Sequence, residues 1–164
     1  MKKSYFLLTT LSVFFFSFCA DTKKSQIPVA TEVYSDAYIS RVEKDVFNLI
    51  NKHRQSIGLQ PLKWMSGITD QAEIHSSDMA LRKTGFGHEG FETRYAKLQK
   101  AIGNVHAGAE NVAYGTLTAE QVTKGWLGSP GHKKNIEGDY NLTGIGVAVD
   151  KQGLLFFTQI FLKQ

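Results

Sequence analysis

Apolar residues recur every three or four positions over residues 36–57, which is the period of an amphipathic helix. The residues on this stripe are Ile39, Val42, Val46, Leu49 and Ile50. Gly58 follows directly and favours a helix end, because glycine readily takes the left-handed conformation found there. The pattern therefore predicts a first helix that lays one face on the core.

Three further helices are predicted over residues 68–83, 92–101 and 118–127. The helix over 68–83 places His75 on its apolar face. His75 is therefore either a hydrogen-bonded histidine at the edge of the core or part of a cleft. The last helix opens with a capping box formed by Thr118 and Gln121. Ser129 and Pro130 are expected to end it.

Residues 142–149 and 154–162 are rich in β-branched and aromatic side chains and are joined by a short polar stretch with Gly153. This pattern predicts an antiparallel hairpin with a four-residue loop, residues 150–153. Residues 59–64 are expected to be a connector, and residues 103–115 a loop. Because helices come first and strands last, the predicted class is α+β rather than a strand–helix–strand repeat.

A length of 164 residues with 42% hydrophobic and 21% charged residues is typical of one globular domain. The formal net charge is +4, and removing Lys2 and Lys3 with a leader would leave +2. A charge this small does not predict a nucleic-acid partner.

The first 19 residues have the pattern of a signal peptide: Lys2 and Lys3, then an apolar stretch over residues 5–18. That stretch is shorter than the roughly 20 residues of a membrane-spanning helix. The only cysteine, Cys19, follows a stretch that loosely resembles a lipobox. Either Cys19 is the lipid-modified first residue of a lipoprotein anchored to the membrane, or it is removed with the leader. Residues 20–35 read as a polar tether and residues 36–164 as the exported domain.

Two glycine–histidine pairs, Gly87-His88 and Gly131-His132, lie on either side of Glu110. Glycine allows tight turns that aim the next side chain, so both histidines are candidates for a cleft. Three interpretations remain open. The three side chains hydrogen-bond one another and hold loops together, they bind a metal weakly, or they catalyse a reaction with Glu110 as base and the histidines as proton carriers.

The chain resembles the CAP superfamily, which comprises cysteine-rich secretory proteins, antigen-five allergens and pathogenesis-related proteins, and in particular its bacterial, cysteine-free SCP-like branch. The resemblance implies a three-layer α-β-α sandwich with a small antiparallel sheet. The matching segments are residues 51–54, 58–62, 72–79, 87–88, Arg94, 109–111, Trp126, 129–132, 135–136, 144–147 and 158–161.

Carried over by position, His88 and His132 match the two cleft histidines of the family, and Glu110 matches its first cleft acid. The second acid falls near Ser129, which carries no charge. His75, Asn111 and Ser129 are further candidates for the cleft. The resemblance implies that His88, His132 and Glu110 bind Zn²⁺ or another divalent metal, or that the cleft works without one.

The main functional hypothesis is an exported binding module for a lipid, a sterol or a protein ligand. The alternative is a metal-assisted hydrolase that acts on peptides or cell-envelope polymers, and a third is a lipid-tethered structural protein of the envelope. Phe86, Phe91 and Tyr114 either line a groove beside the cleft or belong to the core.

Overall fold

The computed structural model describes residues 34–164. The predicted signal peptide, Cys19 and almost all of the predicted tether lie outside the described residues. Over the range 34–164, no helix combines the length and the apolar character needed to cross a membrane.

The described chain forms five helices and a four-stranded sheet with the strand order β1-β3-β4-β2. Strands β2, β3 and β4 are antiparallel, whereas the short β1 runs parallel to β3. In chain order the elements are α1 (Asp36–Ser56), β1 (Lys63–Trp64), α2 (Ser66–Ala80), α3 (Phe91–Ile102), β2 (Ala107–Gly115), α4 (Ala119–Gly128), α5 (Pro130–Ile136), β3 (Leu142–Val149) and β4 (Leu155–Lys163).

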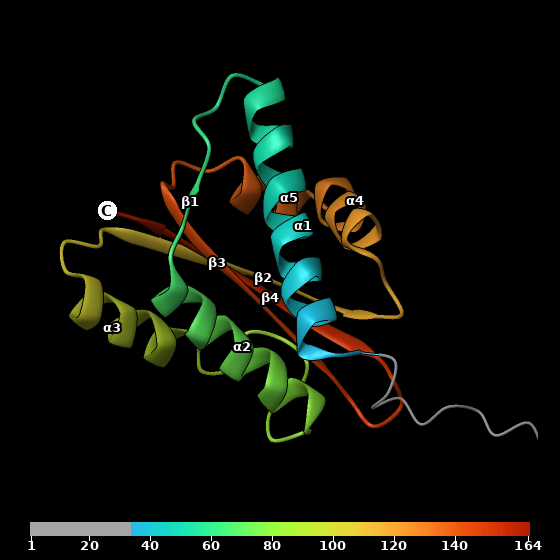
Figure 1. Cartoon of the computed structure of the whole chain (residues 1–164). Coiled ribbons are helices and arrows are strands. Elements are labelled where there is room, and N and C mark those ends of the chain that lie inside the picture. Colours follow the sequence, from blue (N-terminus) through green and yellow to red (C-terminus); the bar gives the residue numbers. More distant parts are fainter. Residues whose placement is uncertain (1–33) are drawn as a thin grey trace, which may run out of the picture.

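The sheet lies between two helical layers, with α1, α4 and α5 on one side and α2 and α3 on the other (Figure 1). Strand β4 feeds both cores, because successive side chains of a strand point to opposite faces. Phe157 and Phe161 pack with α1 and α4, while Ile160 and Leu162 pack with α2 and α3. The predicted α+β sandwich is confirmed, with β1 as a parallel addition to the antiparallel strands.

Helix α2 lies unusually close to β3, and two glycines make this possible. A Cβ added to Gly144 would lie 2.2 Å from the Thr69 amide nitrogen, and one added to Gly146 would lie 2.0 Å from that of Glu73. Ser76 of α2 donates a hydrogen bond to the Gly146 carbonyl at 2.8 Å. Ser76 is therefore a packing residue of this helix–strand contact.

The buried guanidinium of Arg54, near the end of α1, joins three segments that are distant in sequence. It donates hydrogen bonds to the carbonyls of Gln60, Ile136, Gly138 and Tyr140 at 2.6–3.2 Å. Ile136 is the last residue of α5, and the other carbonyls lie on the connectors before β1 and β3. Arg54 thus fixes the end of α5 relative to α1.

Two elements differ from the sequence-based expectation. Residues 107–115 are predicted as loop but form β2, which pairs with β4 along its whole length. Ser129 and Pro130 end α4 at Gly128 as expected, but Pro130 also starts a further helix, α5, which the sequence did not predict. Proline suits a first helical position, where its missing N–H costs no hydrogen bond. His132 therefore lies on a helix rather than on a turn.

Candidate functional site

Glu110 and Arg94 form the centre of the site as a buried ion pair. Glu110 comes from β2, and its side chain is only 1% exposed. Arg94 reaches it from α3: Nε donates to Oε2 at 3.0 Å, and Nη2 lies 2.9 Å from Oε1 and 2.7 Å from Oε2. A two-pronged guanidinium–carboxylate contact is strong and directional, so it compensates the buried charge of Glu110.

His88 lies on the loop between α2 and α3, and its Nδ1 is 3.0 Å from Glu110 Oε1. Its side chain is 54% exposed, in contrast to the buried carboxylate. Gly87, just before it, has φ = +146°, which favours glycine over other residues. When Nδ1 carries the proton donated to Glu110, Nε2 is left as the accepting nitrogen of an exposed ring.

His75 is buried on α2 and hydrogen-bonds the loop that carries His88. Its Nε2 donates to the carbonyl of Gly87 at 2.8 Å, and it lies 3.8 Å from Glu110 Oε1. Both sequence-based alternatives for His75 therefore describe part of its position: it is hydrogen-bonded at the edge of the core, and it adjoins the cleft. Burial lowers the pKa of His75, and the charge of Arg94 lowers it further.

The lowered pKa of His75 predicts a loss of stability in acid. Below the ordinary histidine value of 6.5 the unfolded chain takes up a proton that the folded chain resists, so the free energy of unfolding falls as the pH falls. We expect His75→Gln, whose amide can still donate to Gly87, to show a smaller loss between pH 7.5 and pH 5.5. Urea unfolding of both proteins at the two pH values measures this. Equal losses would contradict it.

His132 lies on α5 and is not joined to Glu110 by a side-chain hydrogen bond in the described part of the chain. Its ring packs against Trp126, with centroids 6.5 Å apart. It lines a cavity of about 280 Å³ together with Ser129 and Val112. Burial lowers the pKa of His132, and the charge of His88 lowers it further.

Asn111 and Asn135 connect the two histidine-bearing parts of the site. The Asn111 amide donates to the backbone carbonyl of His132 at 3.1 Å, and it accepts from Asn135 Nδ2 at 2.8 Å. Asn135 Nδ2 also lies 3.2 Å from the Glu110 carbonyl. Asn111 therefore holds α5 against β2 and positions His132. Ser129 lines the cavity beside His132 but caps no helix with its hydroxyl.

The structure thus brings His88, Glu110 and His75 into one cluster, with His132 beside it rather than in it. Only His88 lies on a loop; Glu110 is on a strand and His132 on a helix. Sequence reasoning assigns no role to Arg94, the residue that pairs with Glu110. A charged residue four positions before Leu98, on the buried face of α3, was the signal that it needs a buried partner.

The predicted three-ligand metal centre does not fit these residues as they lie. Both Glu110 oxygens accept hydrogen bonds from Arg94, and Oε1 also contacts His88. A guanidinium on the carboxylate also repels a divalent cation. Within residues 34–164 no group of three or more His, Cys, Asp and Glu side chains is arranged to hold a metal ion. Zinc binding stays a prediction.

Two of the three aromatic residues expected beside the cleft, Phe86 and Tyr114, lie at the surface, and Phe91 is half-buried. Phe86 and Tyr114 are each 52% exposed, and their rings touch with centroids 4.7 Å apart. Tyr114 also stacks on Phe156, while Phe91 stacks on Tyr95 of α3. Phe86 and Tyr114 are therefore not core residues.

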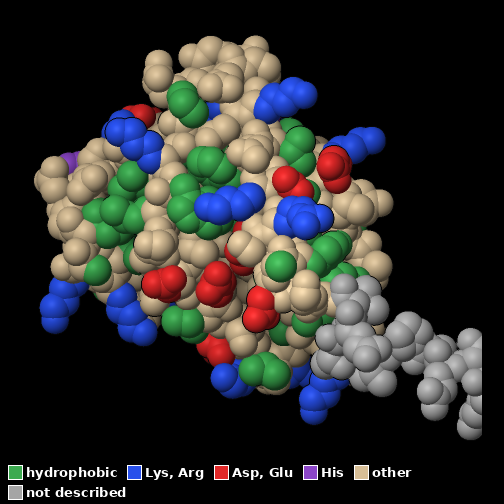
Figure 2. Space-filling view, in the orientation of Figure 1, with side chains coloured by type: hydrophobic (Ala, Val, Ile, Leu, Met, Phe, Trp, Pro, Cys, Tyr) green, Lys and Arg blue, Asp and Glu red, His purple; other side chains and the backbone are tan. Residues whose placement is uncertain are grey.

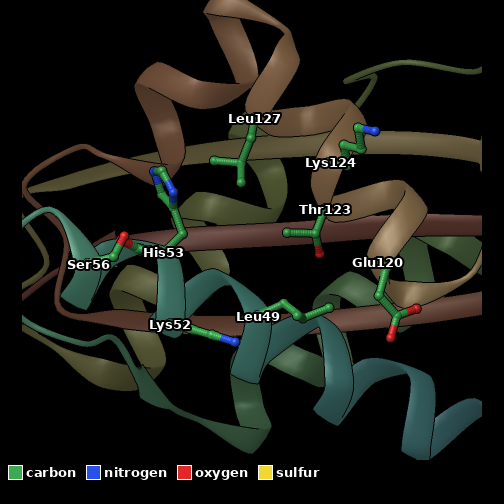
Figure 3. Close-up of a pocket in the computed structure, with 8 residues that line it drawn as sticks. All are labelled: Leu49, Lys52, His53, Ser56, Glu120, Thr123, Lys124 and Leu127. Atoms are coloured by element: carbon green, nitrogen blue, oxygen red, sulfur yellow. The ribbon is translucent and has the colours of Figure 1, made fainter.

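A larger apolar groove of about 420 Å³ lies elsewhere, between α1 and α4. Helix α4 presents one face to this groove and the opposite face to the cavity of His132. Figure 3 shows Leu127 and Thr123 of α4 extending toward α1, which contributes Leu49 and His53. The groove and the histidine cleft are separate sites.

The family model described as the cysteine-rich secretory protein family, CAP, matches residues 47–161. This is most of the chain, and the protein belongs to the CAP family. The uncharacterized protein YkwD of Bacillus subtilis (strain 168) is 35% identical over 136 residues, covering 80% of this chain and 51% of YkwD. The uncharacterized membrane protein YlbC of the same organism is 32% identical over 127 residues, covering 74% of this chain and 34% of YlbC. The chain thus spans about half the length of one curated relative and a third of the other.

Solved structures share the fold. An extracellular protein containing an SCP domain from Bacillus anthracis str. Ames is 27% identical with a TM-score of 0.66, covering 80% of this chain and 44% of that one. Two others are below 25% identity and show the fold alone. One is a cysteine-rich secretory protein of Staphylococcus aureus, with 21% identity and a TM-score of 0.67, covering 79% of this chain and 40% of that one. The other is an outer surface protein of Borrelia burgdorferi, with 19% identity and a TM-score of 0.65, covering 76% of this chain and 93% of that one.

Proposed function

We propose that this CAP-family protein is an exported binding module, anchored to the membrane through Cys19, that holds the apolar chain of a lipid in the groove between α1 and α4. Export is supported by the signal-peptide pattern of the first 19 residues and by the secretory family to which the domain belongs. The groove has the size of a small-molecule site, which is typically about 300–1,000 Å³.

The observation that carries the proposal is the hydroxyl of Thr123. This residue is 5% exposed and lines the groove, yet its Oγ1 has no hydrogen-bond partner within the described chain. A buried polar atom without a partner costs about 1–3 kcal/mol. Because an acyl chain has no hydrogen-bonding group, the polar head of a bound lipid or a water is the partner expected for this hydroxyl. Thr123 lies beside Leu49 and Leu127, which supply apolar walls for an acyl chain.

The charges at the rim favour a lipid with an anionic or polar head. Lys52 and Lys124 belong to the lining, with Glu120 at one end (Figure 3). At the other end His53 Nε2 lies 2.8 Å from Glu137 Oε1, which ties α1 to the residue after α5. An acyl chain between the leucines leaves its head at these polar side chains.

The hydrolase alternative receives less support. A metal-assisted hydrolase needs a metal ion, and within residues 34–164 no group of three or more His, Cys, Asp and Glu side chains is arranged to hold one. Over the same range neither His88 nor His132 hydrogen-bonds a serine or threonine hydroxyl, so no side-chain nucleophile is activated by them. The cluster around Glu110 is better suited to holding the loop of His88, β2 and α3 together, since most of its polar atoms bond one another.

The lipid proposal predicts saturable binding of an environment-sensitive fatty-acid probe, dansyl-undecanoic acid, and its displacement by oleate. We expect Leu127→Asp to weaken probe binding at least about tenfold, because it places a charge on the apolar wall. Fluorescence titration of the purified domain, residues 34–164, measures the affinity.

Matched controls separate the groove from the rest of the surface. Leu81→Asp changes an exposed leucine outside the groove and should leave the affinity unchanged. His88→Ala tests the cleft and should also leave it unchanged. Thr123→Val should raise the free energy of unfolding of the ligand-free protein by about 1 kcal/mol. It should also lower the affinity for a lipid that hydrogen-bonds the hydroxyl. Probe binding that responds to His88→Ala but not to Leu127→Asp would refute the assignment to this groove.

A further inference from the structure

A second groove of about 420 Å³ lies on the other side of α1, between α1, α2 and β3. Its lining includes three carboxylates, Asp36, Glu43 and Glu73, and two hydroxyls, Ser40 and Ser77. Figure 2 shows Asp and Glu side chains gathered on the face where α1 and α2 meet. This concentration of negative charge is unexpected in a chain whose formal net charge is +4.

Glu43 distinguishes this groove from an ordinary acidic surface. The residue is only 5% exposed, although it lines the groove. One carboxylate oxygen, Oε1, accepts the backbone N–H of Val147 at 2.9 Å. Within residues 34–164 the second oxygen, Oε2, accepts no hydrogen bond, and it is not among the fully buried unpaired atoms, so it keeps some exposed surface. No Lys, Arg or His in this range forms an ion pair with Glu43. A carboxylate that is both buried and without a counter-ion is rare in folded proteins.

The neighbouring lysine supplies little of the missing positive charge, because Lys44 has the smallest of the effects on the pKa of Glu43, which it lowers. Lys44 follows Glu43 in the chain, but its Nζ lies over the ring of Trp64, 3.7 Å from the centroid. This cation–π contact holds the ammonium away from the groove. Glu73 adds further negative charge from α2, and the two glutamates repel one another.

The electrostatics agree with the geometry. Burial raises the pKa of Glu43 to about 7, against the opposing effect of the Val147 hydrogen bond, and Glu73 raises it further. Burial and the charge of Asp70 also raise the pKa of Glu73. A cation placed in the groove would relieve both carboxylates.

We propose that the groove between α1, α2 and β3 is a binding site for a primary ammonium or guanidinium group carried on an alkyl chain. The described residues hold no group of three acidic or histidine side chains arranged around a metal ion, so an organic cation fits better than an inner-sphere metal. Its N–H groups donate to Glu43 and Glu73, and Ile39, Val147 and Ala148 supply apolar contacts for the alkyl chain. This site is independent of the lipid groove.

Two sources carry this chemistry: a free amine, or a lysine or arginine side chain of a peptide. We expect calorimetric titration of the purified protein at pH 8 with agmatine to show one site. The peptide acetyl-Gly-Arg-Gly-amide should compete for that site when the natural source is a side chain. Agmatine binding without competition by the peptide identifies a free amine. No binding of either at millimolar concentration overturns the proposal.

Charge-neutral variants separate the ligand from the fold. Glu43→Gln keeps an amide oxygen that accepts the Val147 N–H, and it should lower the affinity for agmatine at least tenfold. Glu73 has no such backbone contact in the described residues, and Glu73→Gln should lower the affinity for agmatine severalfold. This variant replaces Glu43→Gln in the test if Glu43→Gln fails to fold. Asp45→Asn removes an exposed charge of α1 outside the groove and should have little effect. Equal affinities for the wild type, Glu43→Gln and Glu73→Gln would overturn the proposal.

The pH dependence gives a second readout. The titratable groups facing the site are Asp36 and Glu43 of α1 and Glu73 of α2, with Lys44 and Asp70 nearby; β3 contributes none. Protonation of Glu43 removes the negative charge, so agmatine should bind more weakly at pH 5.5 than at pH 8. Glu43→Gln should flatten this difference. An equally steep pH dependence in wild type and Glu43→Gln would contradict a role for Glu43.

Discussion

Arg94→Met is expected to lower the free energy of unfolding by about 3–5 kcal/mol, because it leaves the carboxylate of Glu110 buried without its cation. Arg94 Nε and Nη2 make three contacts with the two Glu110 oxygens, and Nη1 donates to the carbonyl of Glu89 at 2.8 Å. The substitution therefore also frees the loop that carries His88. Chemical unfolding followed by circular dichroism measures the loss.

A double variant distinguishes the ion pair from simple packing. Glu110→Leu with Arg94→Met removes both charges. Its loss in the free energy of unfolding should be much smaller than the sum of the losses caused by the two single substitutions. If the two single losses simply add in the double variant, the pair is not the source of the effect. Lys163→Met, which breaks an exposed pair with Asp139, is the surface control and should change stability by less than about 1 kcal/mol.

Gly146→Ala is expected to prevent stable folding or to cost more than about 4 kcal/mol, well beyond the usual range for a single substitution. The new Cβ would lie 2.0 Å from the amide nitrogen of Glu73 and 2.3 Å from the carbonyl carbon of Ala72. Both are backbone atoms of α2, so relief requires the whole helix to move off β3. Yield of soluble protein and the thermal unfolding midpoint measure the effect.

Gly125→Ala is the matched control for this substitution. Gly125 lies within α4, and a Cβ there meets no atom within 4 Å. Alanine is the better helix former by about 0.5–1 kcal/mol, so this variant should be as stable as the wild type or more so. A Gly146→Ala protein with an unchanged midpoint would mean that α2 does not pack against β3 as described.

The elements with a clear hydrophobic period could be predicted from the sequence. The first predicted helix, residues 36–57, ends within one residue of α1, and the predicted hairpin corresponds to β3 and β4. Each buries a regular stripe, and the period of that stripe is visible in the sequence. The capping box at Thr118 is also present in the structure as predicted.

Strand β2 could not be predicted, because its signal is tertiary. Residues 107–115 include Ala107, Gly108, Ala109 and Gly115, which have little preference for strands. The strand is fixed instead by its ladder with β4, and the ring of Tyr95 lies where a side chain at Gly108 would be. A residue-by-residue reading of the sequence cannot detect a strand whose stability lies in its partner.

The candidate site shows a similar limit. Spacing alone does not bring His88 to Glu110, 22 residues away; the family resemblance supplied that expectation, and the 3.0 Å contact agrees with it. The same resemblance placed Glu110 among metal ligands, whereas its oxygens are occupied by Arg94. An acid can be located from a motif, but what it binds depends on which residue of a distant helix faces it.

The hydrogen bonds of Arg54 affect the redox conditions in which the domain is stable. The only cysteine of the chain, Cys19, precedes the described domain, so no disulfide is available to cross-link residues 34–164. One guanidinium instead joins the end of α1 to the carbonyls of Gln60, Ile136, Gly138 and Tyr140. This cross-link contains no oxidisable group, so the fold should be equally stable in reducing and in oxidising surroundings.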